Sequence, residues 1–120
     1  MPGADLAALI TAALRLNSTT LQDGDVVAVA QKVVSKAEDR FVDLSVIVPS
    51  KRALTLAAVV EKDPRLVEVI LGESRRIVRH SKGVLIVVQR LGMVMANAGV
   101  DASNVDGGDS RVLLLPQAPD

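Results

Sequence analysis

Two polar segments carry residue types that could do chemistry. The first is Gln31–Glu38, in which Lys32 and Lys36 stand four positions apart with Ser35 between them. Lysines can hold phosphate oxygens as point charges, and a hydroxyl can donate to the same oxygens. The segment follows the apolar run Val26–Ala30, and strand ends in open sheets expose unpaired N–H groups to ligands. The pattern is compatible with a phosphate contact, whereas the spacing alone favours a solvated amphipathic turn with Lys on its outer face.

The second segment is Ala96–Val105, which concentrates carboxylate, amide and hydroxyl oxygens in one glycine-containing loop. Hard cations such as Mg²⁺ take oxygen ligands of this kind, usually one or two carboxylates with waters and phosphates. The alternative is an Asx turn, in which Asp101 or Asn104 bonds its own backbone. His80 is the single histidine, so a three-histidine metal site is excluded.

The apolar spacing predicts the elements that must position these segments. Helices are expected where Asp5, Ser50 and Asp63 can cap apolar stripes. The continuous apolar run Val26–Ala30 predicts a central strand that is buried on both faces. Further strands are expected at residues 41–48, 77–79, 84–88, 93–96 and 111–115. The expected class is α+β, with a mixed, largely antiparallel sheet and flanking helices.

Composition excludes several classes of function. The chain has 120 residues, balances 14 basic against 14 acidic side chains, and has one aromatic residue, Phe41. Binding to a nucleic-acid duplex needs a basic excess and single-strand binding uses aromatic rings, so we expect no nucleic-acid partner. Cysteine is absent, which excludes disulfides and thiolate chemistry. No apolar run approaches the roughly 20 residues of a membrane span, and no signal-peptide pattern is present, so we expect no membrane partner and a cytoplasmic location.

Taken together and in order, the two polar segments resemble the coenzyme F420:L-glutamate ligase family. The similarity covers nearly the whole chain, through the stretches Leu21–Val27, Gln31–Glu38, Lys62–Glu68, Glu73–Ser74, Arg76–Arg79, Arg90–Gly92, Ala96–Val105 and Leu113–Pro116. The Val-Ser-Lys-Ala-Glu and Ala-Asn-Ala-Gly-Val-Asp runs are its most specific parts. The sequence departs from the family pattern at Asp39, where glycine is common, and at Met93 and Met95, where Phe and Cys are more usual.

The resemblance implies an activity, which is GTP-driven addition of L-glutamate to the lactyl-phosphate carboxylate of coenzyme F420-0 through an acyl phosphate. It also implies two divalent cations, Mg²⁺ or Mn²⁺, beside the transferring phosphoryl group. By motif, Gln31, Lys32 and Lys36 fall where the family contacts nucleotide. Asp101 falls on a metal ligand, and Asn104 falls on a further nucleotide contact. Family members form intertwined dimers, so a homodimer is the expected assembly.

Compared with the family, residues 1–120 resemble an N-terminal portion that is shortened at both ends. Family members begin earlier and continue into a segment that supplies further metal ligands. We therefore expect this region to work as part of a larger or split enzyme, with a C-terminal half as partner. The isolated 120 residues are expected to fold poorly or to associate, and not to catalyse ligation. The alternatives are a ligase portion fused to a nitroreductase-like domain and a non-catalytic subunit that keeps the fold and binds a partner chain or nucleotide.

Overall fold

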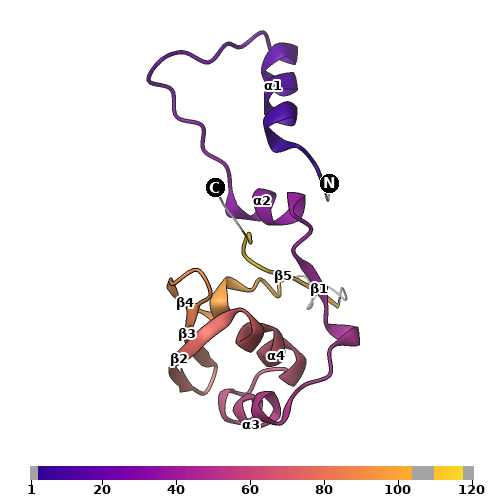
Figure 1. The fold of residues 1–120 in the computed structure, drawn as a ribbon, viewed down its shortest axis with the longest axis vertical. Helices are drawn as coiled ribbons and strands as arrows, with labels where there is room; N and C mark the ends of the chain where they lie inside the picture. Colours follow the sequence, from indigo (N-terminus) through magenta and orange to yellow (C-terminus); the bar gives the residue numbers. More distant parts are fainter. Residues whose placement is uncertain (1–2, 104–109, 118–120) are drawn as a thin grey trace. The chain divides into compact units, whose positions relative to one another are not determined.

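The structure, a computed structural model, describes residues 3–103 and 110–117 and divides into two units (Figure 1). Unit 1 comprises Met1–Arg40 and Pro116–Asp120, and unit 2 comprises Phe41–Leu115. Along the described chain, two helices precede the first strand, and two more helices precede a run of antiparallel strands. The predicted α+β class is therefore confirmed.

Unit 1 contains the helices α1 (Leu6–Leu16) and α2 (Gln31–Ala37). The predicted cap of α1 is confirmed, because the Asp5 carboxylate accepts a hydrogen bond of 3.1 Å from the Ala8 N–H. The apolar stripe of α1 is less buried than its spacing suggests, since none of the residues of this helix is buried in the described structure. Capping and periodicity thus explain why α1 is helical without explaining what it packs against.

The prediction of a central buried strand at Val26–Ala30 is wrong. The segment is extended, but it pairs with no strand among the described residues, and every side chain in it is exposed. Val26, for example, is 89% exposed. An apolar run shows that a segment can be buried, whereas a strand also requires a partner for its backbone N–H and C=O groups. The apolar run did not reveal whether such a partner exists.

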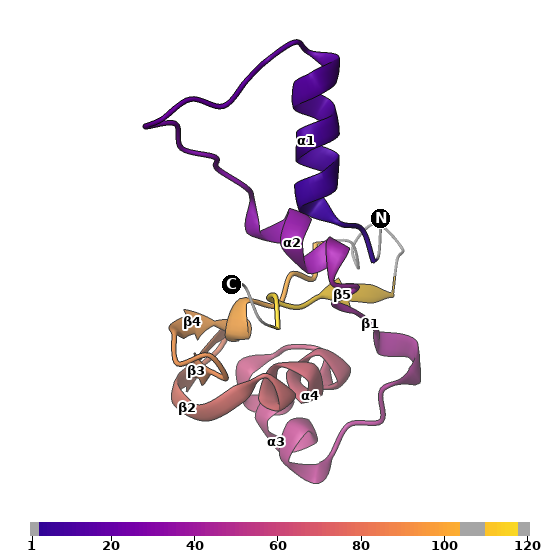
Figure 2. The same cartoon turned by 45° about the horizontal axis from the view of Figure 1, so that its top comes forward.

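Unit 2 begins its helical part with α3 (Lys51–Val60) and α4 (Pro64–Gly72), which lie against each other in Figure 2. Both starts are as the sequence predicts, because Ser50 caps α3 and Asp63 caps α4. The Ser50 hydroxyl also donates to the Glu68 carboxylate at 2.8 Å. This bond joins the first turn of α3 to α4, so one serine serves both helices.

The strands of unit 2 form two antiparallel sheets. The strands β2 (Ser74–Ser81), β3 (Val84–Gln89) and β4 (Val94–Ala96) form a meander in that order, as the sequence predicts. The strands β1 (Phe41–Asp43) and β5 (Arg111–Leu113) pair separately, with Val42 opposite Val112. This second pair joins segments from the two ends of unit 2.

The strand β1 is shorter than the predicted strand at residues 41–48. It ends at Asp43 because the Asp43 carboxylate turns back and accepts hydrogen bonds from the Ser45 N–H and hydroxyl, at 2.9 and 2.7 Å. The chain then enters the 3₁₀ turn η1 (Leu44–Val46). A local side-chain bond to the backbone therefore overrides the β-branched residues that follow.

The hydrophobic core of the described chain lies within unit 2. It is built from α3, α4, the strands β3 and β5, and the turns beside them. Its most enclosed members include Leu44, Val60, Val67, Ile70, Leu85, Val87 and Val112. Large aromatic rings are absent from this list, so small aliphatic side chains fill the space. In the same described residues, no helix has both the length and the apolar character needed to cross a bilayer.

Candidate functional site

The first candidate segment forms the short helix α2 in unit 1. Gln31, Lys32 and Lys36 are all exposed on this helix. Residues four apart lie on the same face of a helix, so the two lysines are neighbours on its surface. Within unit 1, the structure thus places together three of the four residues that the resemblance assigns to nucleotide.

Ser35 behaves differently from the lysines on either side of it. Its side chain is fully buried, and its hydroxyl accepts a hydrogen bond of 2.5 Å from the Gln31 side-chain amide. Its carbonyl accepts a further bond of 2.9 Å from the Arg40 N–H. The expectation that this hydroxyl donates to phosphate is therefore wrong for this conformation. Ser35 instead fixes Gln31 and closes the end of α2.

The second candidate segment contains a left-handed turn. Asn97, Ala98 and Gly99 have φ angles of 54°, 53° and 72°, in succession. For a residue with a side chain this conformation costs roughly 1–2 kcal/mol, and Ala98 has neither the flexibility of glycine nor the side-chain hydrogen bonds of asparagine. Such strain persists where surrounding structure imposes it, and it clusters at functional sites. The turn lies directly before Val100 and Asp101.

The packing around Gly99 explains what imposes the turn. A β-carbon added at Gly99 would lie 2.7 Å from Cγ of Leu115, far inside normal contact. Leu115 is buried, as is Ala98 beside the glycine. The Val100 N–H donates to the Asn97 carbonyl at 2.9 Å and closes the turn. Glycine is therefore required here both by its φ angle and by the available space.

Asp101 is held by its backbone and by its side chain. Its N–H and carbonyl exchange hydrogen bonds of 2.8 and 3.0 Å with Leu113. Its Oδ1 accepts a bond of 2.9 Å from the Ser103 N–H, which is the Asx turn considered as the alternative role. A carboxylate offers about four acceptor positions, so this bond is compatible with a cation. The turn and a metal-binding role do not exclude each other.

The donor chemistry around Asp101 fits one ligand of a hard cation. In the described residues, no group of three or more His, Asp or Glu side chains could enclose a metal ion. Asn104, the other predicted residue of this loop, lies outside the described residues. Asp101 can therefore supply one carboxylate, and the remaining ligands of a cation there would have to come from phosphate, water or other residues.

Asp43 is a positioning residue that sequence reasoning missed. Its Oδ1 accepts a hydrogen bond of 2.6 Å from the Ser110 hydroxyl, and the Leu44 N–H donates to the Ser110 carbonyl at 2.8 Å. The Ser110 and Ser45 hydroxyls lower the pKa of Asp43 to about 2. The Asp-Leu-Ser spacing could have indicated the local turn. No sequence signal identified Ser110 as the distant partner.

The predicted site residues therefore fall in both units. Gln31, Lys32 and Lys36 belong to unit 1, and Asp101 belongs to unit 2. Within each unit, the arrangement suits the chemistry expected of it. Unit 1 presents two cations on one helix face, and unit 2 presents a carboxylate from a rigid turn.

Comparison with known proteins assigns the chain to a family. A protein-family model described as F420-0:Gamma-glutamyl ligase matches residues 1–120. The coenzyme F420:L-glutamate ligase of Methanopyrus kandleri is 50% identical over 119 residues, which cover 99% of this chain and 44% of the relative. The enzyme of that name from Methanothermobacter thermautotrophicus is 46% identical over 118 residues, covering 98% of this chain and 46% of the relative.

The chain thus spans slightly less than half the length of these relatives. The match nevertheless includes both polar segments, from α2 to the turn that precedes Asp101. The chain belongs to the F420-0:gamma-glutamyl ligase family.

Proposed function

We propose that this chain is part of an enzyme that ligates L-glutamate to coenzyme F420-0, with GTP as the phosphoryl donor. The observation that carries the proposal is the family match over residues 1–120, with relatives that bear the name coenzyme F420:L-glutamate ligase. The exposed cations of α2 and the rigid carboxylate of Asp101 support it, because phosphoryl transfer depends mainly on positioning and electrostatic stabilisation.

The α2 residues would bind the nucleotide. Lys32 and Lys36 lie on one exposed helix face, from which both could approach phosphate oxygens. Gln31 is held in place by its bond to the buried Ser35. This arrangement supports a phosphate contact by two lysines and a polar contact by Gln31. The Asn104 amide would add a nucleotide contact from the loop that follows Asp101.

Asp101 would hold a divalent cation, Mg²⁺ or Mn²⁺, beside the phosphates. When bound, the cation would neutralise charge on the transferring phosphoryl group. The contribution of the chain is to fix the carboxylate before the ion arrives. The ladder to Leu113 and the left-handed turn at Asn97–Gly99 hold the Asp101 backbone. A ligand whose backbone is fixed loses little conformational freedom on binding.

The reaction needs no protein nucleophile. A carboxylate oxygen of F420-0 forms a bond to the γ-phosphorus of GTP, and GDP leaves with the electrons of the broken bond. The amine of glutamate then attacks the acyl carbon and loses a proton, and inorganic phosphate leaves. The absence of cysteine is compatible with this scheme, because cations and hydrogen-bond donors around phosphates are what it requires.

The proposal includes a second portion of the ligase. Relatives are more than twice as long as the region they share with this chain, so they can supply ligands that residues 1–120 do not. We propose that residues 1–120 act as the N-terminal portion of one ligase domain. That domain would be completed by a C-terminal half and would assemble as a homodimer.

The proposed function is tested by GDP release from the full-length ligase that contains this region. Release should depend on both L-glutamate and F420-0, and on Mg²⁺ or Mn²⁺. Asp101→Asn keeps the acceptor for the Ser103 N–H, so the melting temperature should change little. Turnover should fall by more than the roughly 10- to 100-fold that loss of an outer-shell metal partner typically causes.

A matched control is Asp25→Asn. Asp25 is exposed, and its carboxylate also accepts one backbone N–H, from Gln22 at 2.8 Å. This variant removes the same charge from a comparable turn and should retain turnover. If Asp101→Asn were as active as Asp25→Asn at ordinary metal concentration, the role of Asp101 would be to close the Asx turn and not to bind a cation. GDP release that ignored F420-0 would refute the proposed substrate.

A further inference from the structure

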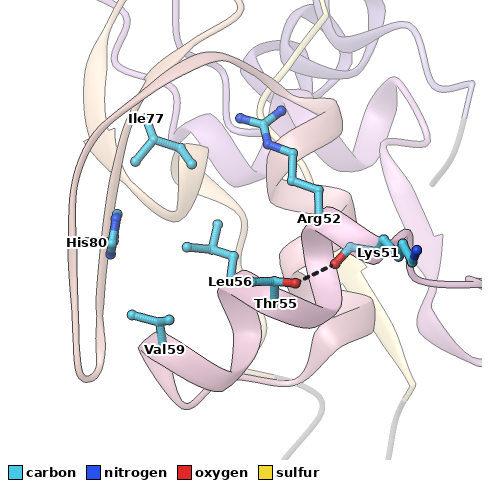
Figure 3. A pocket seen from close by; sticks show the side chains of 7 residues that line it. All are labelled: Lys51, Arg52, Thr55, Leu56, Val59, Ile77 and His80. Carbon is cyan, nitrogen blue, oxygen red and sulfur yellow. Dashed lines mark hydrogen bonds between the residues drawn. The ribbon is translucent and has the colours of Figure 1, made fainter.

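A cavity of about 470 Å³ opens between α3 and β2, within unit 2. Figure 3 shows Leu56 and Val59 of α3 facing Ile77 and His80 of β2 across it. Its volume falls in the range of roughly 300–1,000 Å³ that is typical of small-molecule sites. The three aliphatic side chains make its walls apolar. Neither of the two candidate polar segments contributes to its lining.

A second, smaller recess of about 10 Å³ adjoins the cavity. The two share Arg52 and Ile77 as lining residues. Arg75 and Arg76 also line the recess, so three arginine residues line the two adjoining hollows. Positive side chains at the edge of an apolar hollow favour an occupant that carries negative charge.

The residues that line the two cavities include basic side chains and no acidic one. In the part of the chain that the structure describes, the recorded ion pairs involve Arg65, Lys82 and Arg90, and none involves Arg52, Arg75 or Arg76. The Thr55 hydroxyl at the rim donates to the Lys51 carbonyl at 3.0 Å (Figure 3). An occupant with negative charge would complement this rim.

We propose that the cavity binds a small organic anion with an apolar body. A ring or branched chain would lie against Leu56, Val59 and Ile77, and a carboxylate or phosphate would be held by Arg52. Guanidinium binds such groups through paired, charge-assisted hydrogen bonds. Arg75 and Arg76 would add positive potential behind Arg52. This site is additional to the phosphate and cation contacts proposed for α2 and Asp101.

The test uses probes that share one ring and differ in charge. Naphthoate and naphthyl phosphate are the anions, naphthylmethanol is the neutral analogue, and inorganic phosphate is the anion without a ring. Each is titrated into the isotopically labelled full chain, and amide shifts are followed by NMR. The anionic rings should bind at about 1 mM or tighter, which is the affinity that ordinary ligand efficiency gives probes of this size. Naphthylmethanol and inorganic phosphate should each bind at least about tenfold more weakly, because one lacks the charge-assisted bonds and the other lacks the apolar body.

Two variants separate the rim from the walls. Arg52→Gln, at an exposed position, should weaken both anionic rings at least about tenfold and leave naphthylmethanol unchanged, since it removes charge-assisted bonds. Val59→Trp should fill the cavity and weaken all three ring probes. The matched control is Arg79→Gln, because Arg79 lies on the same strand as His80 and lines neither cavity. It should bind like the unaltered chain.

The proposal fails if naphthoate and naphthylmethanol bind equally, or if Arg52→Gln leaves the anionic affinity unchanged. It also fails if the shifted amides lie outside α3 and β2. Should dilution alone reproduce the same shifts, the cavity would be a contact between copies of the chain. Arg52→Gln remains decisive if Val59→Trp does not fold. GDP release by the ligase tests a different set of residues, so the two proposals can fail independently.

Discussion

The two units differ in how completely they bury their apolar side chains. In unit 2, Val60 and Ile70 are completely enclosed, and a contiguous core joins helices to strands. In unit 1, Leu16 and Val26 are 87% and 89% exposed. The two motif segments are therefore supported differently. Asp101 depends on a backbone ladder and on packing against Leu115. The helix that carries Lys32 and Lys36 depends instead on the buried Ser35 and on hydrogen bonds that join its end to Gly3 and Gln117.

This difference suggests that the two halves of the proposed chemistry have different sensitivities. A change in the core of unit 2 should displace Asp101, because its turn rests on Leu115 and its backbone pairs with Leu113. A change on the apolar surface of unit 1 has no comparable route to the α2 lysines. The following experiments test that contrast, from the largest expected effect to the smallest.

The largest effect is expected from deleting core volume. Ile70→Ala should lower the free energy of unfolding by about 2–5 kcal/mol, because it removes a fully buried side chain and leaves a cavity. The paired variant Leu16→Ala removes a mostly exposed side chain and should change it by less than about 0.5 kcal/mol. Chemical denaturation of the full chain measures both. Equal losses in the free energy of unfolding would show that Leu16 is buried in solution. The two units would then not differ in the burial of their apolar side chains.

A slightly smaller effect is expected at the left-handed turn. Gly99→Ala should lower the free energy of unfolding by roughly 2–4 kcal/mol, since it combines an unfavourable φ with a clash against Leu115. Thermal or denaturant unfolding measures the loss. In the ligase, the same change should also lower the affinity for Mg²⁺, because it shifts Asp101.

The two causes at Gly99 can be separated by a double-mutant cycle. Leu115→Ala removes the clashing atoms, so Gly99→Ala should cost less in that background, and the φ term of about 1–2 kcal/mol should remain. Additive losses would mean that Leu115 does not impose the turn. The support of Asp101 would then come from its own loop and its backbone ladder.

A third, smaller effect concerns the nucleotide. Lys36→Ala in the full-length ligase should weaken GTP binding at least about tenfold, as expected for a charged hydrogen bond worth roughly 1.5–3 kcal/mol. The melting temperature should stay nearly constant, because Lys36 is exposed. Calorimetric titration provides the affinity. Lys62→Ala, which removes a lysine outside the segment Gln31–Glu38, is the control. A similar GTP affinity for both variants would show that Lys36 lies on a solvated helix face and does not contact the nucleotide.

The smallest effect is a difference in acid stability. The pKa of Asp43 is about 2 in the folded chain, below its ordinary value of 3.8, because the Ser110 and Ser45 hydroxyls bond the charged form. The stabilisation is present above the ordinary value and is lost as the pH falls through the folded value. Asp43→Asn should therefore lose less stability than the unaltered chain between about pH 4 and pH 2. Parallel acid unfolding curves would show that the Ser110 bond is not made in solution.

Local signals predicted much of the fold. Ser50, Asp63 and Pro64 place the starts of α3 and α4, because capping depends on residues within one turn. The meander was also predictable, since its strands are consecutive and joined by Gly83 and Gly92 in short turns. Because consecutive strands pair with each other, the pairing can be predicted without identifying a partner that is distant in the sequence. Local chemistry was sufficient for these elements.

Features that depend on distant partners were not predictable. The segment Val26–Ala30 has the composition of a buried strand, and composition does not say whether a partner lies beside it. The positive φ of Ala98 is equally hidden, because alanine favours the right-handed region and its sequence neighbours do not reveal that it is buried. For the site, the motif identified Lys36 and Asp101 as candidates. It did not reveal that Ser35 is buried.

The pairing of β1 with β5 has a consequence for the order of folding. Asp43 and Ser110 are 67 positions apart. At a synthesis rate of about 5–20 residues per second, the ribosome needs roughly 3–13 seconds to extend the chain from β1 to β5. During that time β1 has no strand to pair with. The helical hairpin and the meander have short-range contacts and can form in that interval. The loop that carries Asp101 is then completed last, on a scaffold that is already folded.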